Sequence, residues 1–305
     1  LGIESLLVHD DAGTKANLYA TLGPADHPGI LLSGHTDVVP IDGQDWHTDP
    51  FNVVEKDAKL YGRGTCDMKS FVAICLAYAP KFLERGLKIP IHFAFSHDEE
   101  VGCVGVRTLI AKLANEIQPK PMMCIVGEPT LMQVIIGHKG KMSYQCHVRG
   151  LEAHSSLAPQ GVNAVEYAAE LIAYLKGMAR RIQKEGPFDD LYDINHTTVH
   201  TGTVQGGTAL NIVPKDCSFE FEFRCIAGHD GRELYEEVVR HAREVLEPEM
   251  KAIDPSTGFT FEELSAIEGL DIDPGEEVVT LAKALAGRND HAKVAFGTEA
   301  GLFQQ

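Results

Sequence analysis

Histidine and glutamate residues recur directly after apolar runs in the first part of this sequence. They are His35, Glu99, Glu100 and Glu128. Imidazole and carboxylate groups without a thiolate form the ligand set of a catalytic rather than a structural zinc site, and cobalt or manganese would also accept them. Carboxylates gathered at one place repel one another, and a pair of divalent metal ions would explain why they accumulate there.

Two aspartates complete this pattern. Asp37 stands two residues after His35 on an extended segment, so both side chains face the same way and Asp37 can accept the second imidazole N–H of His35. Asp67 follows a glycine-rich turn at the expected start of a helix, where a carboxylate can bridge two ions about 3.5 Å apart. Glu99 and Glu100 are adjacent and should point to different places. One of them can hold metal while the other stays free as a base.

Each of these residues also has an ordinary structural explanation. A single histidine after a strand is usually structural, adjacent glutamates usually form a solvated face, and Asp67 alone would be read as a helix N-cap. Their recurrence at the ends of successive strands favours a metal site over these separate explanations.

The elements that must position these side chains follow an α/β pattern. Apolar runs without polar alternation, which are typical of strands buried on both faces of a parallel sheet, cover Ile30–Leu32, Ile91–Phe95 and Met123–Val126. Helical spacing of apolar residues covers Met68–Glu84 and Val104–Ile117. Ligands bind outside the carboxyl ends of strands in open α/β sheets, and that is where the candidate residues fall.

The pattern changes after residue 140. The expected elements are strands Met142–Val148, Thr197–Val204, Cys217–Phe223 and Gly258–Phe261, and helices Val162–Arg181 and Arg232–Leu246. Their order is βαββαβ, which is the split ferredoxin-like unit. We therefore expect an inserted domain at 141–264. The α/β catalytic domain then covers 1–140 and 265–305, and resumes with helix Glu276–Ala286 and strand Lys293–Phe296.

Composition narrows the range of partners. A net charge of −17, from 27 basic and 44 acidic side chains, argues against binding the phosphate backbone of a nucleic acid. No apolar run reaches the roughly 18 residues that a membrane span needs. The seven cysteines form no C-x-x-C pair, and no signal-peptide pattern is visible, so we expect free thiols and a cytoplasmic protein.

Several motifs together resemble one known family. They are Ser33–Pro40, Tyr61–Lys69, His97–Glu100, Gly127–Thr130, Gly137–Gly140 and Ala153–Ser156. The sequence resembles the dinuclear-zinc metallopeptidase family that includes aminoacylase, succinyl-diaminopimelate desuccinylase and acetylornithine deacetylase. Within that family, Gly161–Ala164, Thr201–Pro214 and Phe296–Phe303 are most similar to the acetylornithine deacetylase branch. The resemblance covers essentially the whole chain.

The resemblance implies a zinc-peptidase-like catalytic domain with a mostly parallel sheet and an inserted dimerisation domain. It implies two zinc ions per subunit, with cobalt as a possible substitute. By position, His35 and Glu128 would hold one ion, Asp67 would bridge both, and Glu100 would hold the second.

The remaining roles are also implied by the resemblance. Glu99 would be the general acid and base, and Asp37 would orient His35. His154 would reach from the inserted domain toward the active site of the partner in a homodimer and stabilise the oxyanion. Asn211 and Arg224 would bind the carboxylate and amide of an N-acyl amino acid.

The expected reaction is removal of the acetyl group from N-acetylornithine, in arginine biosynthesis. Another N-acyl amino acid, N-succinyl-diaminopimelate or a dipeptide remains an alternative substrate, and an inactive metal-binding or dimerisation module is the alternative of another class. The family supplies a last histidine ligand that this sequence does not reach. His291 is not expected to replace it, because it precedes the strand Lys293–Phe296 and would lie at the wrong edge of the sheet. Both ends look cut, so either the chain is a fragment or the last ligand has been lost. Because the imidazole opposite Glu100 is missing, we expect the second ion to bind weakly and the chain itself to have little activity.

Overall fold

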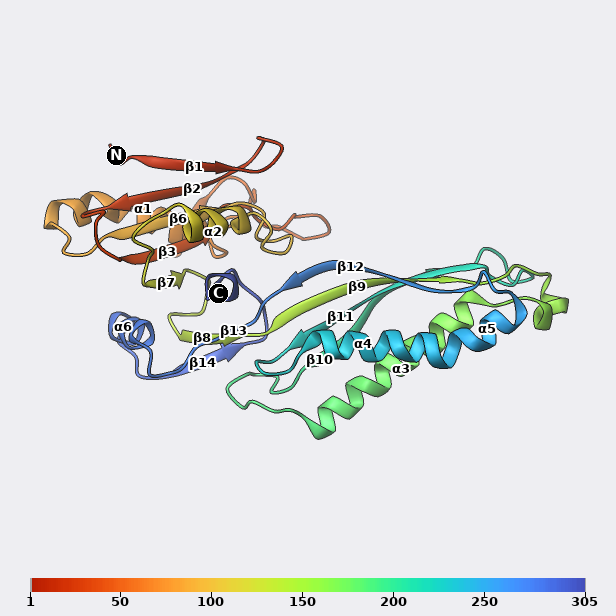
Figure 1. The fold of residues 1–305 in the computed structure, drawn as a ribbon. Coiled ribbons are helices and arrows are strands. Elements are labelled where there is room, and N and C mark those ends of the chain that lie inside the picture. Colours follow the sequence, from red (N-terminus) through yellow and green to blue (C-terminus); the bar gives the residue numbers. More distant parts are fainter. Residues whose placement is uncertain (1, 305) are drawn as a thin grey trace. The chain divides into compact units, whose positions relative to one another are not determined.

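The structure is a computed structural model that describes residues 2–304 of the chain (Figure 1). The chain divides into two compact units, and each is described by itself. Unit 1 comprises Leu1–Ile136, Ile272–Ala292 and Thr298–Gln305, and unit 2 comprises Gly137–Asp271 and Lys293–Gly297. None of the helices in the described part of the chain combines the length and the apolar character that crossing a membrane requires.

Unit 1 is built on a five-stranded sheet of order β1-β2-β6-β3-β7. The strands are β1 (Ser5–His9), β2 (Ala16–Leu22), β3 (Ile30–His35), β6 (Ile91–Ser96) and β7 (Met123–Val126). β3 pairs in parallel with β6 and β7, whereas β2 is antiparallel to β1 and β6. β1, β3, β6 and β7 therefore run in the same direction and β2 runs against them. This confirms the prediction of a mostly parallel central sheet. β2 has no counterpart among the predicted strands.

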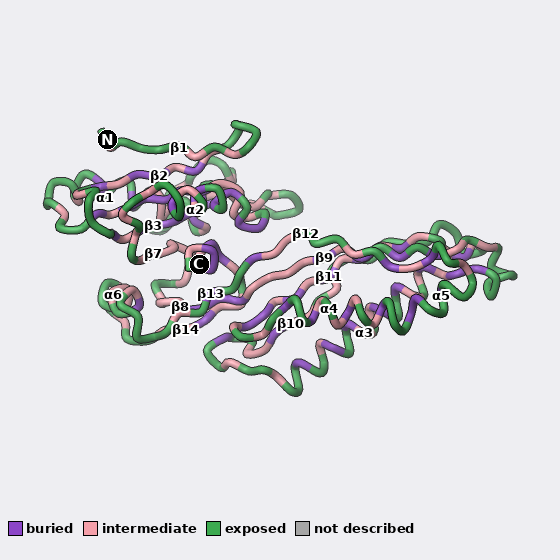
Figure 2. Tube along the Cα trace, viewed as in Figure 1, coloured by how far each residue is buried: buried purple, intermediate pink, exposed green. Residues whose placement is uncertain are grey.

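Helices cover both faces of this sheet. On one face, Leu31 and Ala94 pack with Leu109 of α2 (Val106–Asn115). On the other face, Phe93 packs with Cys75 of α1 (Lys69–Arg85). Successive residues of a strand point to opposite faces, so a strand covered on both sides must be apolar throughout. This explains why β3 and β6 read as mainly apolar runs, and Figure 2 shows their burial.

The remaining elements of the first unit are short. β4 (Val54–Lys56) and β5 (Lys59–Tyr61) form a hairpin, and helices α6 (Glu277–Ala286) and α7 (Ala300–Phe303) follow late in the chain. At three of the four places where the chain passes from one unit to the other, it does so in or directly after a strand of a three-stranded sheet of order β13-β8-β14. Its strands are β8 (Val134–His138), β13 (Leu270–Asp271) and β14 (His291–Val294).

One predicted strand boundary near the end of the chain is wrong. The strand expected at Lys293–Phe296 runs over His291–Val294, so His291 is its first residue and does not precede it. The Nδ1 atom of His291 lies 2.9 Å from Nζ of Lys283. The shift arises because Ala295 and Phe296 are apolar but lie outside the strand, so the apolar run misplaced its end.

Unit 2 is a four-stranded antiparallel sheet of order β10-β11-β9-β12 with helices on one face (Figure 1). Its strands are β9 (Gly140–Arg149), β10 (Thr198–Gly206), β11 (Asp216–Cys225) and β12 (Gly258–Ile267). Its helices are the 3-10 helix Ser155–Gln160, α3 (Ala164–Glu185), α4 (Gly231–His241), the π-helical turn Ala242–Leu246 and α5 (Glu247–Ile253). The main elements follow the predicted βαββαβ order.

The core of unit 2 lies between the sheet and its helices. Phe219, Phe221 and Phe223 of β11 are buried there, while Glu220 and Glu222 lie on the other face. Side chains of a strand alternate between faces, so this sequence fixes which side of β11 meets the helices.

Replacing Phe221 by alanine should lower the free energy of unfolding by about 3–5 kcal/mol, because truncation of a buried aromatic side chain leaves a cavity. Phe221 is 2% exposed, and its ring centroid lies 5.5 Å from that of Tyr144. Urea unfolding followed by circular dichroism measures the change. The control is Phe188→Ala, at a position that is 51% exposed, which should cost less than about 1 kcal/mol. Equal losses for the two variants would contradict this description of the core.

Candidate metal centre and active site

The candidate ligands lie where the parallel strands of unit 1 end. His35 is the last residue of β3, Glu99 and Glu100 follow β6, and Glu128 follows β7. Asp67 lies two residues before the first residue of α1. The carboxyl ends of parallel strands meet at one edge of a sheet, so these residues share a site although they come from four segments.

His35 is the centre of this group. Its side chain is 1% exposed, and its Nε2 atom lies 3.1 Å from Oδ1 of Asp67. The same nitrogen lies 4.0 Å from Oε2 of Glu99 and 4.0 Å from Oε1 of Glu128. One ligand atom from each of His35, Asp67 and Glu128 falls within 4.8 Å of the others. A single metal ion bound among them could contact all three.

The charges at this site also fit a divalent cation. Burial lowers the pKa of His35, but hydrogen bonds to Asp37 and Asp67 and the charges of Glu99 and Glu128 outweigh it and raise that pKa to about 11. Burial, with the charge of Glu99, raises the pKa of Glu128 to about 8. Without metal, the site therefore collects protons at neutral pH. A bound cation would supply the positive charge that these protons otherwise provide.

Glu100 is placed to contact a second ion. Its Oε1 atom is buried and has no hydrogen-bond partner among the residues that the structure describes. Its pKa is raised by burial and by the nearby charge of Asp67. An orphaned buried oxygen is costly, and coordination of a cation would satisfy it. Asp67 and Glu100 are thus the two candidate ligands of a second ion, and Asp67 is shared with the first.

Asp37 contacts both His35 and the loop that follows β6. The Nδ1 atom of His35 lies 3.0 Å from the main-chain oxygen of Asp37 and 3.6 Å from its Oδ1, so the carbonyl is the nearer acceptor. The carboxylate of Asp37 accepts the main-chain N–H groups of Glu99, at 3.2 Å, and Glu100, at 3.0 Å. Burial raises the pKa of Asp37, but the contact with His35 and these N–H groups lower it to about 2. One ionised carboxylate therefore links the segment of His35 to that of the two glutamates.

Glu99 is enclosed and points toward the same centre. Its side chain is 10% exposed. Its Oε2 faces His35, and its Oε1 accepts a hydrogen bond from the thiol of Cys103 at 3.2 Å. Burial raises its pKa. Sequence reasoning did not identify Cys103, because a single buried cysteine in a loop carries no signal of its own.

The three remaining candidate residues lie in unit 2. His154 and Asn211 are exposed neighbours: the main-chain N–H of Ser155 donates to the oxygen of Asn211 at 3.0 Å. Arg224 lies near the other end of β11, where its Nε donates to Oε1 of Glu222 at 2.9 Å. The length of β11 from Asp216 to Arg224 is roughly 27 Å at about 3.4 Å per residue. One copy of unit 2 therefore cannot bring Asn211 and Arg224 to the same small molecule.

A further carboxylate of unit 1 was missed by sequence reasoning. Glu299 is 1% exposed, and its two oxygens accept hydrogen bonds from the hydroxyls of Ser33, at 3.1 Å, and Ser96. The only signal in the sequence is a charged residue inside the short stretch Thr298–Leu302, which is otherwise small or apolar.

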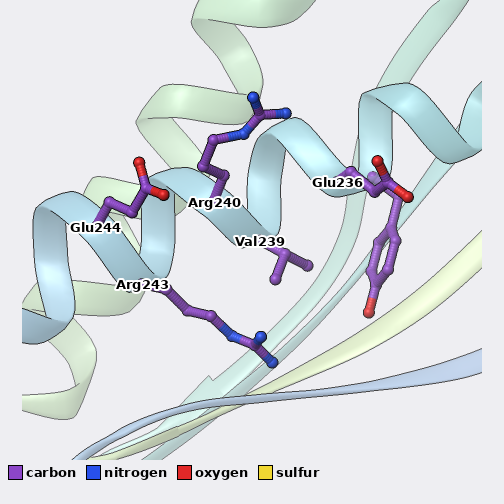
Figure 3. Close-up of a pocket in the computed structure, with 6 residues that line it drawn as sticks. Glu236, Val239, Arg240, Arg243 and Glu244 are labelled. Carbon is purple, nitrogen blue, oxygen red and sulfur yellow. The ribbon is translucent and has the colours of Figure 1, made fainter.

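Unit 2 also carries a surface groove of about 480 Å³ (Figure 3). It runs along α4 and the π-helical turn, and its lining residues are Tyr235, Glu236, Val239, Arg240, Arg243 and Glu244. The lining contains acidic and basic side chains, and it contains none of the candidate catalytic or metal-binding residues. We assign it no role in the chemistry.

Known proteins resemble this chain in sequence. The family described as Peptidase family M20/M25/M40 matches residues 31–305. An acetylornithine deacetylase from Myxococcus xanthus is 34% identical over 294 residues, which cover 95% of this chain and 73% of that protein. An acetylornithine deacetylase from Yersinia pestis is 33% identical over 300 residues, covering 97% of this chain and 74% of that protein.

Solved structures share the fold. An M20 family metallo-carboxypeptidase from Sulfolobus solfataricus aligns with a TM-score of 0.72 at 19% identity, over 99% of this chain and 80% of its own. A dinuclear metal-binding M20 peptidase from Bacillus subtilis aligns with a TM-score of 0.62 at 18% identity, over 99% of this chain and 75% of its own. With the sequence matches and the geometry of the carboxylates around His35, these findings place the chain in peptidase family M20/M25/M40, as a metal-dependent hydrolase of amide bonds.

Proposed function

We propose that this sequence belongs to an enzyme that removes the acetyl group from N-acetylornithine. The observation that carries the proposal is the group of His35, Asp67 and Glu128, whose ligand atoms lie within 4.8 Å of one another. The choice of substrate is supported by relatives at 33% and 34% identity that are named acetylornithine deacetylases. We also propose that this activity serves arginine biosynthesis in the cytoplasm.

Zinc is the proposed metal, and cobalt is the proposed substitute. His35 and Glu128 would hold one ion, Glu100 the second, and Asp67 both. The mixture of one imidazole with carboxylates suits a catalytic zinc ion. When bound, the two ions would supply a water molecule of lowered pKa and polarise the acetyl carbonyl group.

The residues of the chain would then move the protons. Glu99 takes a proton from the attacking water as the new C–O bond forms. It returns that proton to the amine nitrogen as the C–N bond breaks, and acetate and ornithine leave. Its enclosed position suits this work, because burial raises the pKa of Glu99 toward the pH at which it must both accept and donate. A module that only binds metal has no use for an enclosed carboxylate beside its ligands.

The separation within unit 2 supports a homodimer. Asn211 lies in the segment before β11 and Arg224 lies near the far end of that strand, so a substrate that meets both would need two subunits. We propose that Asn211 and Arg224 bind the substrate, and that His154 of one subunit reaches the active site of the other. His154 would donate a hydrogen bond to the oxyanion of the tetrahedral intermediate.

Zinc binding should release about two protons per tightly bound ion at pH 7. The pKa values of about 11 for His35 and about 8 for Glu128 lie above pH 7, so both groups carry a proton until metal displaces it. The apparent affinity should therefore rise between about pH 6 and about pH 8. Calorimetry of the metal-free protein in two buffers of different ionisation enthalpy counts the protons. Glu128→Gln should release fewer, and a pH-independent affinity would contradict the assigned ligands.

In the complete enzyme, Glu99→Gln should keep its metal but lose about 10²–10⁴-fold in kcat, because glutamine cannot carry the proton. Acetate release from N-acetylornithine with saturating zinc or cobalt measures the loss, and elemental analysis measures the metal. The control is Glu84→Gln, at an exposed position of α1, which should match the unchanged protein. Loss of metal in Glu99→Gln would mean that the roles of Glu99 and Glu100 are exchanged. Turnover of another N-acyl amino acid instead would refute the proposed substrate and leave the reaction in place.

Mixing two inactive variants should restore activity if the active site is shared. Glu99→Gln damages a site through its own subunit, and His154→Ala damages the site of the partner subunit. A mixed dimer then contains one site with both defects and one with neither, so refolding the two together should recover about a quarter of the unchanged activity for random pairing. No recovery, although light scattering shows a dimer, would place His154 in the site of its own subunit or outside the site.

A further inference from the structure

Glu299 is a buried carboxylate with a defined set of partners. Its side chain is 1% exposed, and one oxygen accepts from the hydroxyl of Ser33 at 3.1 Å while the other accepts from the hydroxyl of Ser96. Burial is the main cause that raises its pKa, to about 7. Both oxygens are used by serines, and Glu299 does not belong to the residues whose ligand atoms group around His35. We therefore do not count Glu299 among the candidate metal ligands.

The packing of α7 fixes the position of Glu299 without help from a metal. Leu302 is 5% exposed, and its main-chain N–H donates to the main-chain oxygen of Glu299 at 3.0 Å. Phe303 packs against the core cluster that contains Leu31 and Leu109. A short helix anchored in this way holds the carboxylate against one face of the sheet.

The two serines lie beside the residues that carry the chemistry. Ser33 stands two residues before His35 on β3, and therefore on the same face, and Ser96 is the register partner of His35 on β6. Ser96 also ends β6, directly before the segment that leads to Glu99 and Glu100. The main-chain N–H of Thr36 donates to the main-chain oxygen of Ser96 at 2.9 Å. The two hydroxyls thus mark the ends of neighbouring strands, and one carboxylate joins them.

We infer that Glu299 is a positioning residue, which ties Ser33 to Ser96 and so holds the end of β3, with His35, in register with the end of β6, from which Glu99 and Glu100 follow. Its effect on catalysis rests on the proposed function. Its effect on the strand ends does not. The hydrogen bonds, rather than the charge, do this positioning, because each oxygen is directed at a neutral hydroxyl.

The matched variants separate these contributions. Glu299→Ala removes both hydrogen bonds. Glu299→Gln can keep both, since the hydroxyl of Ser33 lies 3.4 Å from the oxygen of Ala94 and can donate there while it accepts from the new amide. The control is Glu247→Ala in unit 2, where a buried carboxylate accepts from the main-chain N–H of Phe259 at 3.1 Å and pairs with Lys251. It removes a buried hydrogen-bonded carboxylate far along the sequence from any candidate ligand.

Hydrogen–deuterium exchange of the metal-free protein is the first measurement. The main-chain N–H of Thr36 donates to the main-chain oxygen of Ser96, and that of Gly127 donates to the main-chain oxygen of Ser33. The exchange rates of these two amides therefore report on the strand ends directly. Both should exchange about tenfold faster or more in Glu299→Ala, whereas amides of β2 in the same sheet should change little. Glu299→Gln should stay near the unchanged protein, and Glu247→Ala should leave these two amides as they were.

Zinc affinity and steady-state kinetics are the second measurement. Residues that support metal ligands are worth about 10–100-fold in affinity or activity, so Glu299→Ala should lose that much zinc affinity and kcat with little change in KM. Glu299→Gln should recover most of both. If the unchanged protein binds no zinc, the proposed function fails, while the exchange rates still decide the inference about Glu299.

Three results would overturn the inference. The first is unchanged exchange at Thr36 and Gly127 in Glu299→Ala. The second is a loss in Glu299→Gln as large as in Glu299→Ala, which would make the charge the important property. The third is faster exchange throughout the sheet, β2 included, which would mean that Glu299 only stabilises the fold. If Glu299→Ala does not fold, Ser96→Ala removes one of the two bonds and should raise exchange at Thr36, whereas no change there would refute the tie.

Discussion

Buried carboxylates repel one another, and unit 1 nevertheless gathers Glu99, Glu128 and Glu299 near one almost inaccessible imidazole. Such an arrangement persists only when the backbone holds it and a cation or bound protons balance it. The sheet provides the first requirement, because β3, β6 and β7 run in parallel and are packed on both faces. The second requirement, a balancing positive charge, suits a metal-dependent hydrolase. The same negative charge that would destabilise the site without a cation increases its affinity for a metal ion.

The layered fold could be predicted because burial on two faces leaves a direct record in sequence. Strands covered on both sides read as apolar runs, and β11 alternates because one face is less buried. β2 was missed because polar residues interrupt it. Asn17 is fully buried, but its side-chain amide donates to the oxygen of Gly105 at 2.8 Å, and only the folded chain supplies that partner. The π-helical turn after α4 likewise has no spacing that distinguishes it from ordinary helix.

The same distinction applies to the site. The grouping of His35, Glu99, Glu100 and Glu128 could be predicted because His35 ends an apolar strand and the glutamates follow two others, so a local pattern carries a geometric meaning. Glu299 could not, because its partner Ser33 lies 266 positions away and no spacing rule connects them. The part played by the main-chain oxygen of Asp37 was also hidden, since every residue has such an oxygen and only the folded loop selects one. Local residue types identify candidate ligands, whereas the groups that hold such side chains in place depend on tertiary packing.

The candidate metal ligands all come from unit 1, and the candidate substrate contacts His154, Asn211 and Arg224 all come from unit 2. Each unit has its own buried core, so a mutation in one need not disturb the packing of the other. Selection can then alter which side chain of a substrate is accepted while the hydrolytic centre stays under separate constraint. A protein built this way can change its substrate without altering its metal ligands, which accords with this fold occurring in a protein named a metallo-carboxypeptidase while the relatives in sequence are named acetylornithine deacetylases.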